Sequence, residues 1–266
     1  MITEKLIIGA VAGDMVGSLH KGKKPGPESF DLLNDRPDFT SDTVLNVAVM
    51  ESLLRERDYA RSLKVYGRKY KDRDYGKAFD RWLQQDDPKP YHSWNNGAAL
   101  RVSPVGFACR TLKEVSDEAY NCASVSHNHP DGIKGAVAIA VSVFLARNGR
   151  TKDEIRDYIE STFSYDLHRQ IDHIRPDYYY DRSSEASVPE SIIAFLESTD
   201  YENAIRLAIS LGGDSGSLAC LTGGIAQAFY KEVPVKITNY VIEQLPHQML
   251  ETLNEFSKTY PLSLFH

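Results

Sequence analysis

Hydrophobic residues recur at the spacing i, i+3, i+4 along most of the chain, which is typical of helices with one buried face. This period predicts helices over residues 44–54, 133–146, 190–197, 202–211 and 218–230. The strict alternation of hydrophobic and polar residues that indicates half-buried strands is scarce. The pattern therefore predicts an all-α fold, a multi-helix bundle that forms a single domain over residues 1–266.

Residues that favour helix starts support this prediction. Thr151 and Glu154 have the spacing of a capping box, and Asp200 directly precedes another predicted helix. Pro130 and Pro189 suit positions in the first turn of a helix, where the missing N–H group is no loss.

Two of the predicted helices, 133–146 and 218–230, are apolar on nearly every side. A helix that is apolar all round is buried all round, so both should lie at the centre of the molecule. Each follows a polar stretch, residues 126–131 in one case and 214–217 in the other. Polar residues that lead into a buried helix are expected at depth, where they suit the floor of a pocket.

The balance of basic and acidic residues restricts the classes of molecule that we expect this protein to bind. The 266 residues include 31 Lys and Arg against 37 Asp and Glu, a formal net charge of −6. This balance argues against a general binder of nucleic acids or anionic membranes. The apolar N-terminal stretch lacks a basic flank and is interrupted by Gly9, Gly13 and Asp14, so it predicts no targeting or membrane-spanning segment. We expect a cytoplasmic protein.

The three cysteines Cys109, Cys122 and Cys220 form no CxxC pair. This spacing favours neither a disulfide framework nor a cysteine zinc site. We expect all three to be small buried hydrophobic residues.

Two polar clusters in the first fifth of the chain allow both an ordinary and a functional interpretation. Gly13 and Gly17 suit a close helix crossing with a C-cap, or a loop that a ligand approaches closely. Residues 39–43, which include Thr40 and Asp42, suit an ordinary N-cap. Their oxygen atoms are also donors that a hard cation such as Mg²⁺ prefers.

A turn over residues 93–97 leads into an apolar helical stretch, and its backbone N–H groups could bind phosphate. Trp94 in this turn could stack on a planar ligand or simply pack. His127 and His129 have a spacing compatible with metal binding, but no cysteine or third histidine lies close by in the sequence. A histidine that positions a ligand, or one satisfied within the loop, is the favoured interpretation.

Gly212 and Gly213 precede Asp214 at the start of the second all-apolar helix. This arrangement lets backbone and carboxylate approach a ligand or ion closely, and it also suits a plain turn with a cap. The buried helix behind it favours the functional interpretation.

In this order, these segments resemble the ADP-ribosylglycohydrolase family, which includes dinitrogenase-reductase-activating glycohydrolases, ADP-ribosylarginine and ADP-ribosylserine hydrolases and the J1 lens crystallins. The resemblance extends from Ile2 to Tyr230 and is carried by residues 9–18, 39–43, 82–106, 126–135, 187–191 and 211–224. It implies an orthogonal all-helical bundle, usually monomeric. It also implies hydrolysis of the bond between ADP-ribose and a protein side chain, at two Mg²⁺ ions.

The resemblance assigns roles to particular residues. Two family motifs, Thr-Asp-Asp-Thr and Gly-Gly-Asp-x-Asp-Thr, supply the metal ligands, and they match here at Thr40, Asp42, Asp214 and Ser217. Asp42 and Asp214 are therefore also the candidate catalytic carboxylates. The ADP-ribose-binding candidates are Ser93, Trp94, Asn96, Gly97, His127 and Gly213. Asn95 stands where glycine is common.

Three positions depart from the family pattern. Ser41 replaces the middle Asp of the first metal motif, and Gly216 replaces the second Asp of the other. Lys21 falls where many members carry an assisting acidic residue. Two carboxylates do not balance two Mg²⁺ ions, so we expect the dinuclear centre to be absent, or reduced to one weakly held ion.

Three functions are compatible with this sequence. The first is a pseudoenzyme that binds ADP-ribose or an ADP-ribosylated partner. The second is a hydrolase that works with one metal ion or none, with Asp42 or Asp214 as base. The third is a structural protein that has kept only the fold, for which a closed cleft would be the supporting observation.

Overall fold

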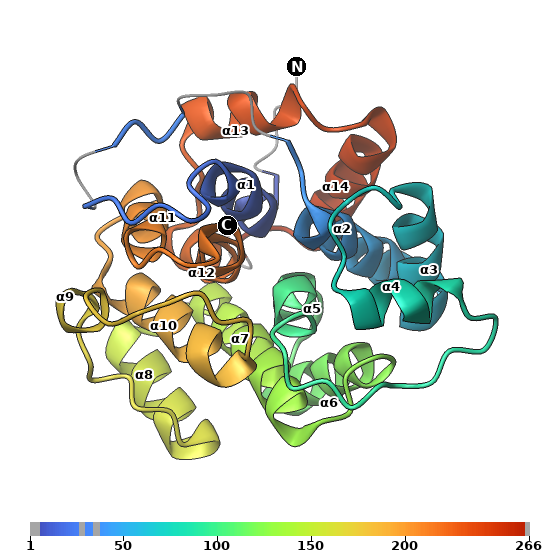
Figure 1. The fold of residues 1–266 in the computed structure, drawn as a ribbon, viewed down its shortest axis with the longest axis horizontal. Helices are drawn as coiled ribbons and strands as arrows, with labels where there is room; N and C mark the ends of the chain where they lie inside the picture. The colour runs from blue at the N-terminus through green and yellow to red at the C-terminus, as the bar shows by residue number, and fades with distance from the viewer. Residues whose placement is uncertain (1–5, 27–29, 34–37, 264–266) are drawn as a thin grey trace.

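The computed structural model describes residues 6–26, 30–33 and 38–263 (Figure 1). Within these residues the chain forms fourteen α-helices and one short 3₁₀ helix, and its β-structure is limited to one isolated bridge between Asn95 and Ser183. The predicted all-α class is confirmed. The helices are α1 Gly9–Ser18, α2 Ser41–Leu54, α3 Tyr59–Lys69, α4 Lys77–Gln84, η1 Ala99–Arg101, α5 Ser103–Ala108, α6 Leu112–Ser124, α7 Pro130–Arg147, α8 Lys152–Phe163, α9 Ile171–Ile174, α10 Ser184–Glu197, α11 Tyr201–Ser210, α12 Ser215–Tyr230, α13 Val235–Ile242 and α14 His247–Thr259.

The five helices predicted from periodicity are α2, α7, α10, α11 and α12. The predicted capping box at Thr151 starts α8, and the Asp200 side chain accepts a hydrogen bond from the backbone N–H of Asn203 at the start of α11. Pro130 is the first residue of α7, as predicted.

The first-turn prediction for Pro189 is wrong. Helix α10 already begins at Ser184, capped by Ser183, so Pro189 lies in the helix interior. The first residues of α10 include serines, so the hydrophobic period that would mark the start of this helix is absent there. Ser187 instead satisfies its hydroxyl by donating to the backbone carbonyl of Ser183, which lets a polar residue be buried within the helix.

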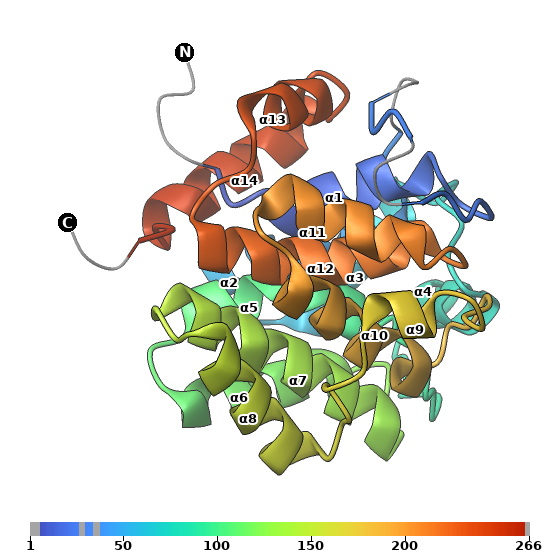
Figure 2. The same ribbon diagram turned by 90° about the vertical axis from the view of Figure 1, so that its left-hand side faces the viewer.

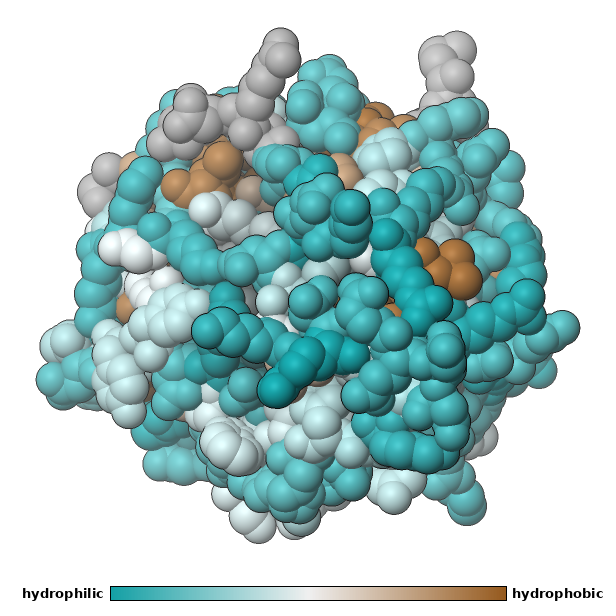
Figure 3. Space-filling view, turned by 45° about the vertical axis from the view of Figure 1, so that its right-hand side comes forward, coloured by the Kyte–Doolittle hydropathy of each residue, from teal (hydrophilic) through white to brown (hydrophobic). Residues whose placement is uncertain are grey.

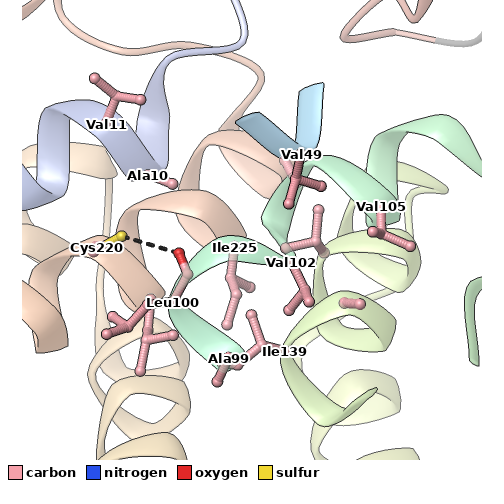
Figure 4. Packing of buried hydrophobic residues seen from close by; sticks show 14 of the residues in the cluster. Ala10, Val11, Val49, Ala99, Leu100, Val102, Val105, Ile139, Cys220 and Ile225 are labelled. Atoms are coloured by element: carbon pink, nitrogen blue, oxygen red, sulfur yellow. Dashed lines mark hydrogen bonds between the residues drawn. The ribbon is translucent and has the colours of Figure 1, made fainter. Parts of the chain in front are cut away.

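Helix α12 lies at the centre of the bundle and packs against α1, α7, α10 and α11 (Figures 1 and 2). Every residue from Ser215 to Ala228 is buried, and α7 is buried along most of its length. The prediction that the two all-apolar helices are central is therefore confirmed. Figure 4 shows the core between them, where side chains from α1, α2, η1, α5, α7 and α12 meet.

Helices α1 and α12 cross at very short distance. A Cβ atom added at Gly13 would lie 2.0 Å from the backbone carbonyl oxygen of Ala219. Only glycine permits this approach. For Gly13, the close helix crossing is the interpretation that the structure supports, and the crossing fixes the end of α1 beside the start of α12.

The cysteines Cys109, Cys122 and Cys220 are buried and unpaired, as predicted. None of the helices within the described residues is both long and apolar enough to cross a membrane. The face shown in Figure 3 is mostly hydrophilic, and its hydrophobic residues form small separate groups.

Candidate active site

A cavity of about 400 Å³ opens where several helix ends converge. Its wall is formed by the C-terminal end of α1, the N-terminal ends of α2, α4 and α12, and the loops that precede η1, α7 and α10. Most of the predicted site residues line it, although they are far apart in sequence: Thr40, Asp42, Ser93, Asn96, Gly97, His127, Asp214 and Ser217.

Two predicted residues lie beside the cavity, outside its lining. The Trp94 side chain is exposed and makes an edge-on ring contact with His129. Gly213 has a φ of 64° and faces the loop before α10, because a Cβ atom there would lie 3.1 Å from the ring of Tyr178. The binding roles of Trp94 and Gly213 stay predictions.

Asp14 is a buried carboxylate at the cavity floor whose importance the sequence did not reveal. Its two oxygens accept hydrogen bonds from the hydroxyl and the backbone N–H of both Thr40 and Thr43 and, at 3.3 Å, from the Ser18 hydroxyl. Burial raises the pKa of Asp14, while the hydrogen bonds from Thr43 and Thr40 lower it. Asp14 thus ties the end of α1 to the start of α2.

Asp42 lies in the first turn of α2. Its Oδ2 accepts a hydrogen bond of 3.2 Å from the Ser217 hydroxyl, which joins the two halves of the predicted metal site. Burial, followed by the neighbouring carboxylates of Asp14 and Asp214, raises the pKa of Asp42 well above its usual range. Thr40 is the N-cap of α2 and its hydroxyl also donates to Asp14, so the capping interpretation of this cluster is confirmed, whereas its metal-binding role stays a prediction.

Asp214 is the N-cap of α12, but its side chain makes no capping hydrogen bond. It faces two cations. Lys21 Nζ lies 3.7 Å from Asp214 Oδ1, and Arg182 Nε lies 3.0 Å from Asp214 Oδ2. The Tyr180 hydroxyl also donates to Asp214 Oδ2, at 3.2 Å. Both oxygens of this carboxylate are therefore occupied by protein groups. Lys21, which falls where many family members carry an acidic residue, therefore lines the cavity and faces Asp214.

Asp74, on the loop before α4, completes this cluster from the far side. It lies 3.7 Å from Lys21 Nζ and 3.9 Å from an Arg182 terminal nitrogen. Lys21, Asp74, Arg182 and Asp214 form a ring of alternating charges, which we call the charge quartet.

Backbone pairing places Arg182. The Asn96 N–H donates to the Arg182 carbonyl at 2.8 Å, and the Ser184 N–H donates to the Trp94 carbonyl at 3.0 Å. This pairing joins residues 93–97, which we call the ligand loop, to the loop before α10. Arg182 was missed because such a pairing between distant loops leaves no periodic signal in the sequence.

His127 lies deep in the cavity wall. Its Nδ1 is 2.9 Å from the Ser126 hydroxyl, and its Nε2 lies 3.1 Å from the Cβ position of Gly97. Burial, and then the charge of Arg101, holds the pKa of His127 well below its usual range. The imidazole is therefore neutral at physiological pH and can exchange a hydrogen bond with a polar ligand.

These donors do not fit the pair of Mg²⁺ ions that the resemblance implies. Gly216 offers no side-chain oxygen, and both oxygens of Asp214 are engaged. Within the described parts of the chain, no three His, Cys, Asp or Glu side chains form a group that could hold a metal ion. A hard divalent cation needs several free oxygen ligands, and two cations already lie beside Asp214.

Comparison with known proteins identifies the family. A family model described as ADP-ribosylglycohydrolase matches residues 4–261. The ADP-ribosylhydrolase ARH3 of Gallus gallus is 24% identical over an alignment of 338 positions, which covers 95% of this chain and 89% of that protein. The ADP-ribosylarginine hydrolase Tri1 of Pseudomonas putida is 24% identical over an alignment of 266 positions, which covers 84% of this chain and 69% of that protein.

A solved structure shares the fold. It is described as an ADP-ribosylglycohydrolase-related protein complex, with a TM-score of 0.72, 21% sequence identity and coverage of 96% of both chains. This similarity shows that the two proteins share a fold. The match of the family model across nearly the whole sequence shows that the chain belongs to the ADP-ribosylglycohydrolase family.

Proposed function

We propose that this protein binds ADP-ribose, or a partner that carries ADP-ribose, and that it has lost hydrolysis by a pair of Mg²⁺ ions. One observation carries the proposal. The cavity combines the ligand loop and His127 with an Asp214 that is engaged by Lys21 and Arg182. The ligand-binding half of the family site is retained, whereas the metal-binding half is altered. We further propose that the protein is a cytoplasmic monomer.

The cavity wall suits a diphosphate. Helix α4 begins at the cavity, and its N-cap, Gly76, offers no side-chain hydrogen bond. The first backbone N–H groups and the positive end of the dipole of α4 favour an anion. Lys77 and Arg81 on α4 add positive charge to the same wall.

Calorimetric titration with ADP-ribose, once with Mg²⁺ and once with EDTA, tests the proposal. We expect binding in both buffers. The absence of binding in both would overturn the proposal.

A matched pair of variants places the ligand. Gly97→Val should abolish binding, because its side chain would project toward His127 Nε2 and fill the cavity there. Ser161→Val, on the exposed side of α8 and away from the cavity, should bind like the unaltered protein. Equal binding by both variants would place the ligand elsewhere.

One observation favours a second candidate, a hydrolase that works without a metal pair. The raised pKa of Asp42 lets it hold a proton nearer to neutral pH than an ordinary carboxyl group, as a general acid must. Release of ADP-ribose from modified arginine or serine peptides in EDTA, lost in Asp42→Asn and in Asp214→Ala, would establish this activity. A purely structural role has no such support, because the cleft is open.

A further inference from the structure

We infer that Arg182 and Lys21 act as built-in cations at the cavity floor, so that this site binds its ligand without a divalent metal ion, and that Arg182 also contacts the ligand. The ligand part of this inference rests on the proposed function. The metal part concerns the chain's own carboxylates and can be tested without any ligand.

The charge quartet balances itself. Lys21 and Arg182 each lie within 4 Å of both Asp74 and Asp214, so two positive charges face two negative charges. A divalent cation that bound Asp214 would have to displace both cations or share their space at close range. Repulsion between like charges at such a distance opposes this.

A second feature concerns Gly216, which also lines the cavity. A Cβ atom added at Gly216 would lie 2.5 Å from the Ser18 hydroxyl oxygen. Ser18 itself is hydrogen-bonded to Asp14. The Ser18 side chain therefore occupies space that a side chain at position 216 would need.

Arg182 remains able to bind a ligand. Its Nε faces Asp214, while one terminal nitrogen makes a longer contact of 3.9 Å with Asp74. A guanidinium group has five N–H donors in a fixed plane, so donors remain for ribose hydroxyls or phosphate oxygens. The backbone pairing with Asn96 holds Arg182 beside the predicted ligand loop.

Mn²⁺ binding to the ligand-free protein, followed by electron paramagnetic resonance, tests the metal part. The unaltered protein should bind Mn²⁺ weakly. Lys21→Gln/Arg182→Gln should gain at least about tenfold in Mn²⁺ affinity, because Asp214 then loses both counter-charges. Both side chains are substantially exposed, 43% and 37%, so these substitutions should leave folding intact.

Lys77→Gln/Arg81→Gln is the matched control. It removes the same two units of charge from the wall of the same cavity, at side chains that are not paired with Asp214. Its Mn²⁺ affinity should change by less than about twofold. The inference is wrong if the unaltered protein binds Mn²⁺ as tightly as the quartet variant, or if the control gains as much.

Titration with ADP-ribose in EDTA tests the ligand part. Arg182→Gln should weaken binding by about tenfold or more. Arg182→Lys should still resist Mn²⁺, because it keeps the charge, but should bind ADP-ribose less tightly, because it loses the planar fork. If Arg182→Lys lost the resistance to Mn²⁺ binding, the role that we assign to the positive charge at position 182 would be contradicted.

The two proposals fail in different ways. If ADP-ribose binds in no buffer, the proposed function falls and the Mn²⁺ comparison still decides the metal part. If ADP-ribose binds to the unaltered protein only when Mg²⁺ is present, the proposed function survives and the inference of built-in cations falls.

Discussion

Asp42 is a carboxyl group whose ionisation is opposed both by its burial and by the neighbouring negative charges. Its pKa is raised by burial first and by the neighbouring carboxylates of Asp14 and Asp214 next. The folded protein therefore holds a proton on Asp42 at pH values where the unfolded chain, with an ordinary carboxyl pKa near 3.9, has released it. Ionised Asp42 lowers the stability of the fold.

We predict that Asp42→Asn stabilises the protein at neutral pH. The amide keeps an oxygen to accept from Ser217 and carries no charge. The free-energy cost of ionising Asp42 in the folded protein grows as the pH rises from its pKa in the unfolded chain to its raised pKa in the folded protein. This cost is zero at pH values where Asp42 is protonated in both states. The gain in free energy of unfolding should thus be present at pH 7 and vanish near pH 3. Urea denaturation at both values measures it, and an equal gain at both would refute this account.

Most of the residues that the sequence singled out line the cavity, for a physical reason, although their roles stay predictions. Thr40, Asp42 and Asp214 lie at helix starts, which are marked locally by polar residues before an apolar run. The importance of Arg182 and Asp74 was not predictable, because their roles depend on loops that meet only in the folded chain.

At the level of elements, the crossing of α1 and α12 determines the geometry of the cavity floor. It brings Asp14 and Ser18 on α1 next to Gly216 and Ser217 on α12. We predict that Gly13→Ala lowers the free energy of unfolding by about 1–3 kcal/mol, because the added methyl group would overlap the Ala219 carbonyl and force the helices apart.

Chemical denaturation measures this loss. Gly76→Ala provides the control, because a Cβ atom there would meet no atom within 4 Å and its φ of −60° suits alanine. Its stability should stay close to that of the unaltered protein. Replacing glycine by alanine reduces the backbone entropy of the unfolded chain and by itself stabilises a protein, so a similar loss in both variants would contradict this account of the crossing.

Elements with a strong apolar period were predictable, whereas elements with a polar or short sequence were not. The buried stretches of α7 and α12 stand out because they are apolar on all sides. The early start of α10 was hidden because Ser184 and Ser187 are buried polar residues. The hydrophobic period of a sequence indicates where apolar side chains are buried. A serine can be buried without contributing to that period.

At the level of the whole molecule, contacts between the two ends of the chain close the bundle. Gln227 on α12 accepts from the N–H groups of Ile8 and Gly9 and donates to the carbonyl of Leu6. The Ile7 N–H donates to the Ser257 hydroxyl on α14, at 2.8 Å. The N-terminal segment is thus bound to two of the last three helices.

This closure predicts that the chain unfolds as one unit. Scanning calorimetry should give a single transition whose calorimetric and van't Hoff enthalpies agree, and sedimentation should report a monomer. Two separate transitions would show that the single-domain prediction for residues 1–266 is wrong.

The contrast between the two tryptophans has a practical consequence. Trp82 is buried in α4 and donates its indole N–H to the Val125 carbonyl at 3.0 Å, whereas Trp94 is 56% exposed beside Ser93 and Asn95 at the cavity rim. Trp82 is therefore shielded from a soluble fluorescence quencher, whereas such a quencher can reach Trp94. A molecule that covers the Trp94 ring would protect its emission from the quencher and leave that of Trp82 unchanged, so binding at the cavity rim would have its own optical reporter.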